Sequence, residues 1–185
     1  LDVKLAEAAW IRTSSAAAAR RLVERGVDRR RLHLIRRGLH DFPECEPREA
    51  LPAARRNELR ILSVGRLVPK KGFFEQLRIY ATLMEARISF RARIAGDGPL
   101  REALSAEISR LGLEERVDLA GHLDPPAVNE GYRWADLFLF TGKVGPDGDR
   151  DGLPNVIPEA MAHGLPVITS DISGTTEAVR DGETG

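Results

Sequence analysis

The sequence predicts an α/β fold in which a parallel sheet is flanked by helices. Between residues 59 and 170, short apolar runs alternate with longer amphipathic runs, which is the pattern of βαβ units. Crossovers of this kind make the strands parallel. The residues of unusual character follow the apolar runs directly, as expected where ligands bind beyond the carboxyl ends of parallel strands. The length of 185 residues suits one domain, or one domain with a flanking piece.

Residues 1–40 have a pattern of their own. They predict a strand over residues 8–12, an Ala- and Arg-rich helix capped by Ser14 or Ser15, and a second strand over residues 32–35.

Residues 41–58 are predicted to be a linker, because they hold three prolines and show no hydrophobic period. The single cysteine of the chain, Cys45, lies in this segment. One cysteine excludes a disulfide framework and a cysteine-based zinc site, and at this place it is better explained as incidental than as a nucleophile.

The main domain is predicted to follow the linker. Its strands are short apolar runs, most of them ending at glycine, and its helices are longer runs with apolar residues on one face. The predicted strands cover residues 59–64, 90–94, 116–120, 135–140 and 166–169. The predicted helices cover residues 73–87, 100–111 and 155–162. The run at residues 135–140 is almost continuously apolar, which indicates a strand buried on both faces.

The charge balance disfavours two classes of partner. The 28 basic and 28 acidic side chains give a formal net charge of zero. A neutral chain lacks the basic excess by which proteins bind nucleic acid or an anionic membrane, so nucleic acid is not predicted as a partner. Of the basic residues, 24 are arginine and four are lysine, so a lysine is the more informative residue in this chain.

Arg66 and Lys71 flank the loop after the first strand of the main domain, and Lys70 adjoins Lys71. Two such flanking cations beside a helix N-terminus favour a phosphate or diphosphate, because the free amides and the helix dipole already attract anions. The alternative is an ordinary solvated basic loop. The loop lacks the Gly-Lys-Ser/Thr of a Walker P-loop, and the Gly-Asp-Gly at residues 96–98 lacks the third glycine of a dinucleotide-binding fingerprint.

The acidic segment at residues 147–152 permits a calcium interpretation. Its alternating aspartates followed by glycine match the opening of an EF-hand loop. The twelfth position of such a loop must be a bidentate glutamate, but Pro158 stands there. An arginine also separates the carboxylates, so calcium is disfavoured.

A second interpretation uses the same residues. Pro158 fits only the first turn of a helix, which places the helix start near residues 154–155. Asp151 then precedes the helix N-terminus and Glu159 ends its first turn, so two carboxylates frame a set of free amides. This arrangement suits a ligand with hydroxyls at both ends and anionic charge between them, namely a sugar, a diphosphate and a ribose. The alternative is that both carboxylates only complement the helix dipole, at roughly 0.3–1 kcal/mol each.

Five loops of the chain match one family in order. The segment at residues 151–170, Asp-Gly-Leu-Pro-Asn-Val-Ile-Pro-Glu and onward, resembles the Glu-x7-Glu signature of the family-4 retaining glycosyltransferases, which have the GT-B fold. The other matches are the Gly-Arg-Leu-x-x-x-Lys-Gly loop at residues 63–72, the turn at residues 95–99, the strand end at residues 117–121, and the Gly-x-x-Glu-x-Val-x-x-Gly-x-x-Gly segment at residues 173–185.

The resemblance implies a domain organisation. Residues 59–185 would be the Rossmann-like C-terminal domain of a GT-B fold, which binds the nucleotide sugar. Residues 1–40 more loosely resemble the end of the first domain, and residues 41–58 would link the two. A family member needs two domains that face each other across a cleft, and this chain starts without methionine and stops within a polar run. It is therefore expected to be the donor-binding half, truncated at both ends.

The resemblance also implies residue roles. Arg66 and Lys71 would hold the donor diphosphate and neutralise charge on the departing nucleotide, and Glu159 would bind the ribose hydroxyls. Asp151 would contact hydroxyls of the transferred sugar as a catalytic-site residue, although the family usually has the longer Glu there. The further donor contacts implied are Gly152, Leu153, Asn155 and Val156 at the sugar and phosphates, His122 and Leu123 beside the base, and Thr176 and Glu177 at the far side of the cleft. Met161 and His163 are expected to pack the helix.

The activity implied is transfer of a hexosyl-type unit from a nucleotide-diphosphate sugar to an acceptor, with retained configuration and in polysaccharide or glycoconjugate synthesis. No obligatory metal or other cofactor is expected. The acceptor would be a saccharide or a lipid-linked molecule. A cytoplasmic location is expected, at most at the inner face of the membrane, with any peripheral membrane contact made through the missing first domain.

Two alternatives to this activity stay open. A GT-B sugar-nucleotide epimerase shares the fold and the donor but not the acidic-x7-Glu segment. The chain is otherwise only a nucleotide-binding module, inactive without its first domain.

Overall fold

The computed structural model describes residues 2–36, 38–39, 58–145, 148–172 and 174–185. The predicted linker therefore lies, apart from its last residue, outside the described residues, as do Cys45 and Asp147. Within the described ranges, no helix combines the length and the apolar character that crossing a bilayer requires.

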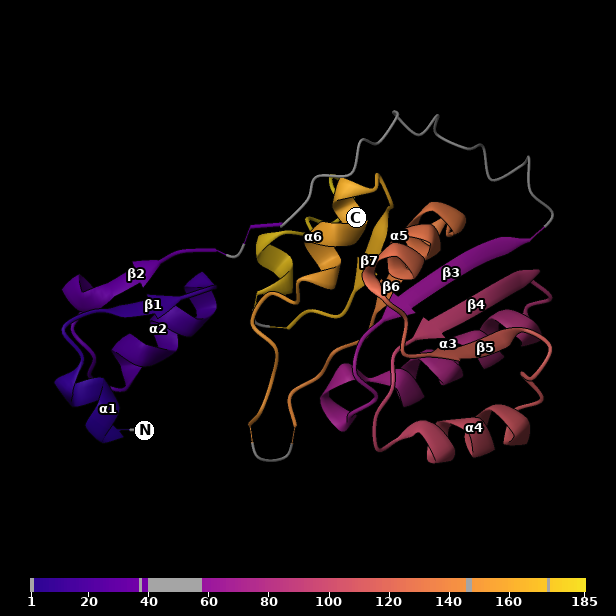
Figure 1. Ribbon diagram of the computed structural model, residues 1–185, viewed down its shortest axis with the longest axis horizontal. Coiled ribbons are helices and arrows are strands. Elements are labelled where there is room, and N and C mark those ends of the chain that lie inside the picture. Colours follow the sequence, from indigo (N-terminus) through magenta and orange to yellow (C-terminus); the bar gives the residue numbers. More distant parts are fainter. Residues whose placement is uncertain (1, 37, 40–57, 146–147, 173) are drawn as a thin grey trace.

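The N-terminal part is a small unit with a two-stranded parallel sheet (Figure 1). The predicted order of strand, helix and strand is confirmed. The first strand is shorter than predicted and ends one residue later, at Thr13, and a short helix before it was not predicted. Ser15 caps the longer helix, since its hydroxyl oxygen accepts a hydrogen bond from the Ala18 amide at 3.2 Å. The elements are α1 (Asp2–Glu7), β1 (Ile11–Thr13), α2 (Ala16–Glu24), the 3-10 turn η1 (Arg29–Arg31) and β2 (Leu32–Leu34).

The main part is a five-stranded sheet in the order β5-β4-β3-β6-β7, and every neighbouring pair is parallel. The predicted fold class is therefore confirmed. The strands are β3 (Leu59–Val64), β4 (Phe90–Ala95), β5 (Val117–Gly121), β6 (Leu137–Phe140) and β7 (Val167–Thr169). The helical elements are η3 (Pro69–Lys71), α3 (Phe73–Glu85), α4 (Arg101–Arg110), α5 (Pro125–Trp134), α6 (Val156–Ala162) and η4 (Thr175–Glu177).

Helix α5 is an element that the sequence analysis missed. Asp124 caps it by accepting a hydrogen bond from the Ala127 amide at 2.9 Å, and Pro125 occupies its first turn. An aspartate followed by proline is a recognised helix start, so the signal was present.

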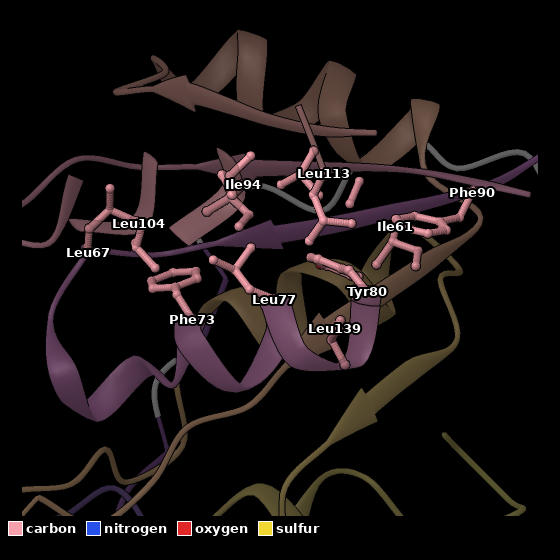
Figure 2. Packing of buried hydrophobic residues seen from close by; sticks show 13 residues of the cluster. Ile61, Leu67, Phe73, Leu77, Tyr80, Phe90, Ile94, Leu104, Leu113 and Leu139 are labelled. Atoms are coloured by element: carbon pink, nitrogen blue, oxygen red, sulfur yellow. The ribbon is translucent and has the colours of Figure 1, made fainter. Parts of the chain in front are cut away.

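The sheet buries apolar residues on both faces, and adjacent strand residues point to opposite sides. Ile61 belongs to the core under α3 and α4, where Tyr80 stacks on Phe90 with ring centroids 5.6 Å apart (Figure 2). Leu62, the next residue, belongs to the second core under α5 and α6. This burial on both faces explains why the sequences of the strands are nearly continuous apolar runs.

The strand order places the loop after β3 and the loop after β6 side by side. From β3 the chain fills one side of the sheet with β4 and β5, and it then returns to the other side with β6 and β7. Strands β3 and β6 are hydrogen-bonded neighbours, with Leu62 opposite Phe138. In open parallel sheets the ligand crevice lies at this reversal, so the loops after β3 and β6 are the first candidates for a site.

Candidate functional site

The loops after β3 and β6 are bonded to each other. The Lys143 amide donates to the Lys70 carbonyl oxygen at 2.8 Å, and the Thr141 hydroxyl donates to the Gly72 carbonyl oxygen at 2.7 Å. Gly72 has a left-handed φ of 70°, and a Cβ there would overlap the Thr141 carbonyl. Only glycine permits this approach, which fixes the lysines of one loop against the acidic segment of the other.

Two lysines and two aspartates form the centre of the site. Lys71 Nζ lies 2.7 Å from Asp151 Oδ2, and these side chains are only 15% and 17% exposed. Lys70 Nζ lies 3.0 Å from Asp149 Oδ2 and 3.7 Å from Asp151 Oδ1. The hydrogen bond to Asp149 raises the pKa of Lys70 despite partial desolvation, so this ammonium is cationic at neutral pH. The structure therefore brings together the predicted residues Lys71 and Asp151.

Arg66 lies in the same loop as these lysines and is exposed. It forms no ion pair with any residue in the part of the chain that the structure describes. Its backbone is held from both sides, because the amides of Gly65 and Leu67 donate to the carbonyl oxygens of Ala95 and Asp97, both at 2.9 Å. The loop therefore presents a guanidinium that no described carboxylate pairs with, on a backbone fixed by hydrogen bonds.

Glu159 on α6 is positioned by a tyrosine that the sequence analysis did not identify. The Tyr132 hydroxyl donates to Glu159 Oε2 at 2.9 Å, and the tyrosine ring stacks on His163 with centroids 4.8 Å apart. Burial and then the charge of Glu159 raise the pKa of Tyr132, which keeps the hydroxyl protonated as a donor. His163 is buried, consistent with the packing role predicted for it. Tyr132 was missed because it lies on α5.

The turn that leads into α6 packs closely against the segment after β7 and against the N-terminal unit. Pro158 lies in the first turn, as predicted, and α6 begins at Val156 with Asn155 as its cap residue. A Cβ on Gly174 would come within 2.8 Å of the Gly152 carbonyl, and one on Gly152 within 3.3 Å of the Ser14 hydroxyl oxygen. The predicted donor contacts Gly152, Leu153, Asn155 and Val156 therefore lie on one continuous turn that starts beside Asp151.

Three predicted residues lie on loops other than those after β3 and β6. His122 is exposed and Leu123 half-buried; both follow β5, the edge strand that lies two strands from β3. Thr176 is exposed on η4. The roles proposed for them beside the base and at the far side of the cleft stay predictions.

Glu177 contacts the N-terminal unit. Its Oε1 accepts a hydrogen bond from the Ala17 amide at 3.1 Å, and its Oε2 pairs with Arg36 Nη2 at 2.7 Å. Burial alone would raise the pKa of Glu177, but the amides of Ala16 and Ala17 and the Arg36 guanidinium outweigh it and lower the pKa. The carboxylate thus ties α2 to the main domain, and its donor-side role stays a prediction.

The lowered pKa of Glu177 predicts a pH-dependent contribution to stability. A carboxylate whose pKa falls on folding stabilises the folded state above its ordinary value of 4.5, and that stabilisation is lost as the pH drops through the folded pKa. In urea unfolding, Glu177→Gln should cost about 1–2 kcal/mol near neutral pH and almost nothing at about pH 3. Glu183→Gln, in an exposed pair with Arg180, is the matched control and should change little. An equal cost at both pH values would contradict this role for Glu177.

In the described part of the acidic loop, the aspartates face lysines and do not gather around a common point. Within the described residues, no group of three or more His, Cys, Asp or Glu side chains could hold a metal ion. Asp149 and Asp151 instead face Lys70 and Lys71. Both described aspartates of the proposed calcium loop are thus matched with ammonium groups.

Comparison with known proteins gives one matching family and several relatives. The family model described as "Glycosyl transferases group 1" matches residues 49–185. WcaL of Escherichia coli strain K12, provisionally named a colanic acid biosynthesis glycosyltransferase, is 35% identical over 167 residues, covering 90% of this chain and 40% of WcaL. The amylovoran biosynthesis glycosyltransferase AmsK of Erwinia amylovora is 33% identical over 168 residues, covering 89% of this chain and 40% of AmsK. The chain thus spans about 40% of the length of these relatives.

A solved structure with the same arrangement is HepE of Anabaena in complex with UDP-glucose. Its TM-score to this chain is 0.78 at 23% identity, and the match covers 98% of this chain and 50% of HepE. At that identity the likeness supports the fold alone.

Proposed function

The chain belongs to the glycosyl transferases group 1 family, and from this premise we propose that it binds the nucleotide-diphosphate sugar of a retaining, family-4 type glycosyltransferase. The observation that carries the proposal is the Lys71–Asp151 pair, with Lys70 and Arg66 beside it, at the reversal point between β3 and β6. Cations at this point suit a diphosphate, and neighbouring carboxylates suit the hydroxyls of a sugar and a ribose.

In this proposal each residue acts on one part of the donor. Lys71 and Arg66 bind the diphosphate, and Asp151, released in part from Lys71 by that anion, accepts hydrogen bonds from the transferred sugar. Glu159, held by Tyr132, binds the ribose. The bond between the anomeric carbon and the diphosphate oxygen breaks, and the acceptor hydroxyl oxygen bonds to that carbon from the same face. The hydroxyl proton passes to the departing diphosphate oxygen, and the cations stabilise the negative charge that remains on the nucleotide.

The length of the relatives supports a further part of the proposal. Because the chain spans about 40% of WcaL and AmsK, we assign residues 59–185 to the donor-binding domain and residues 1–40 to the end of a preceding domain. The acceptor, a saccharide or lipid-linked saccharide in polysaccharide synthesis, would be held mainly by that preceding domain. The 185 residues alone should therefore bind the donor and show little or no transfer. The presence of Asp151 and Glu159 at the signature spacing disfavours the epimerase alternative.

Calorimetric titration of the chain with UDP, GDP and ADP tests this proposal. One nucleotide should bind, with an affinity that EDTA leaves unchanged, because lysine and arginine supply the positive charge. The absence of binding by all three nucleotides, or its loss on adding EDTA, would contradict the proposed site. Calcium binding without nucleotide binding would instead support the disfavoured calcium interpretation.

A further inference from the structure

A cavity lies between the N-terminal unit and the acidic loop, beside the donor site described above, with which it shares Asp149. Its volume is about 470 Å³, within the range of small-molecule sites. Thr13 and Ser14 at the end of β1, one face of α2, and residues 148–150 line it. It thus spans two segments that are far apart in sequence.

Four arginines line this cavity: Arg12, Arg21, Arg25 and Arg150. None of the four forms an ion pair with a residue in the described part of the chain. Among the described residues that line the cavity, the one carboxylate is that of Asp149, which pairs with Lys70 at 3.0 Å. The cavity therefore concentrates positive charge in a chain whose net charge is zero.

Two of these guanidiniums are fixed in place by their own backbone contacts. Arg12 Nε donates to the Ile35 carbonyl oxygen at 3.0 Å, and Arg150 Nε donates to the Gly148 carbonyl oxygen at 3.2 Å. These bonds orient each side chain and leave its Nη groups as donors. Arg21 and Arg150 are also half-buried, which reduces the screening of their charge by water.

The N-terminus of α2 does not itself supply this site. The Ala17 amide donates to Glu177, and the Ala18 amide donates to the Ser15 hydroxyl oxygen. Recognition in the cavity therefore depends on guanidinium groups, whose planar fork suits the two oxygens of a carboxylate or a phosphate.

We propose that this arginine-lined cavity binds an oxyanion group, a carboxylate or a phosphate, carried by the saccharide acceptor. That the ligand is the acceptor rests on the proposed transferase function. That the cavity binds an anion rests only on the residues that line it. Asp149 lines the cavity and pairs with Lys70 of the donor loop, so the anion would lie next to the donor diphosphate. An acidic acceptor held there would present its hydroxyls close to the bond that breaks.

Calorimetry with three monosaccharides of one ring type tests the site: glucose 1-phosphate, glucuronate and glucose. The chain should bind one or both anionic sugars at least about tenfold more tightly than glucose, since a guanidinium–oxyanion pair is a charge-assisted contact. The tighter of the two anions identifies the group as phosphate or carboxylate.

Variants on two separate segments locate the binding. Arg21→Gln on α2 and Arg150→Gln in the acidic loop should each weaken the anionic sugar about tenfold or more. Arg20→Gln, on the same helix but outside the cavity lining, is the matched control and should bind as the unmodified chain does. Far-ultraviolet circular dichroism and thermal melting check that each variant is folded.

The Lys71→Ala variant separates this inference from the proposed function. It should weaken nucleotide binding about tenfold and leave binding of the anionic sugar unchanged. Failure of nucleotide binding in the unmodified chain would refute the donor site and leave the anion result to stand by itself. Unchanged anion affinity in both Arg21→Gln and Arg150→Gln, or equal affinity for glucose, would overturn the anion site.

Discussion

Replacing both Arg66 and Lys71 with alanine is expected to weaken binding of the nucleoside diphosphate by about 100-fold or more. Each cation contributes a charge-assisted hydrogen bond to a phosphate, worth roughly 1.5–3 kcal/mol, and a tenfold change in affinity corresponds to about 1.4 kcal/mol. Calorimetry on the single and double variants measures the effect. Each single variant should lose about tenfold.

The Lys71→Ala variant also removes the nearer of the two ammonium groups beside Asp151, so two controls are needed. Lys71→Ala combined with Asp151→Asn also removes the carboxylate that Lys71 neutralised, and it should regain thermal stability but not nucleotide affinity. Arg110→Ala breaks an exposed pair with Glu107 on α4 and should leave binding unchanged. Full nucleotide affinity in the Arg66 and Lys71 double variant would refute the diphosphate role.

Replacing Gly72 with alanine is expected to destabilise the fold by about 2–5 kcal/mol. The left-handed backbone costs an L-residue roughly 1–2 kcal/mol, and the overlap of the new Cβ with the Thr141 carbonyl adds an overpacking cost of about 1–3 kcal/mol. Urea unfolding measures the sum. Because Gly72 adjoins Lys71, nucleotide affinity should fall in the same variant.

Gly112 provides a matched control for the Gly72 substitution. Its φ of 66° is almost the same as the 70° of Gly72, but a Cβ at Gly112 would meet no atom within 4 Å. Gly112→Ala should therefore show only the backbone cost, roughly 1–2 kcal/mol. Equal destabilisation by the two substitutions would mean that the packing between the β3 and β6 loops contributes nothing.

The strands of the main domain could be predicted because their physical signal is local. Burial on both faces makes a strand such as β6 a nearly continuous apolar run, and that run is visible without any knowledge of its neighbours. Helix α5 also had a local signal in Asp124 and Pro125. It was missed because its start follows directly on the loop after β5.

The site could be predicted only in part, because its geometry depends on strand order. The sequence predicts that Lys71 and Asp151 follow two different strands. Only the adjacency of β3 and β6 brings Lys71 Nζ to within 2.7 Å of Asp151 Oδ2. The hydrogen bond from Tyr132 to Glu159 joins two helices, and the contact from Ala17 to Glu177 spans 160 residues of sequence. No local pattern encodes contacts of that kind.

The central claim is that a nucleoside diphosphate binds at the reversal point between β3 and β6. The most direct test is to titrate the isotopically labelled chain with the nucleotide that binds best and to follow each backbone amide by NMR. The largest changes in amide chemical shift should fall at residues 65–72 and 151–159. Those on α4, which carries none of the proposed donor contacts, should be smaller. Changes confined to the loop after β5 or to the N-terminal unit would contradict the claim.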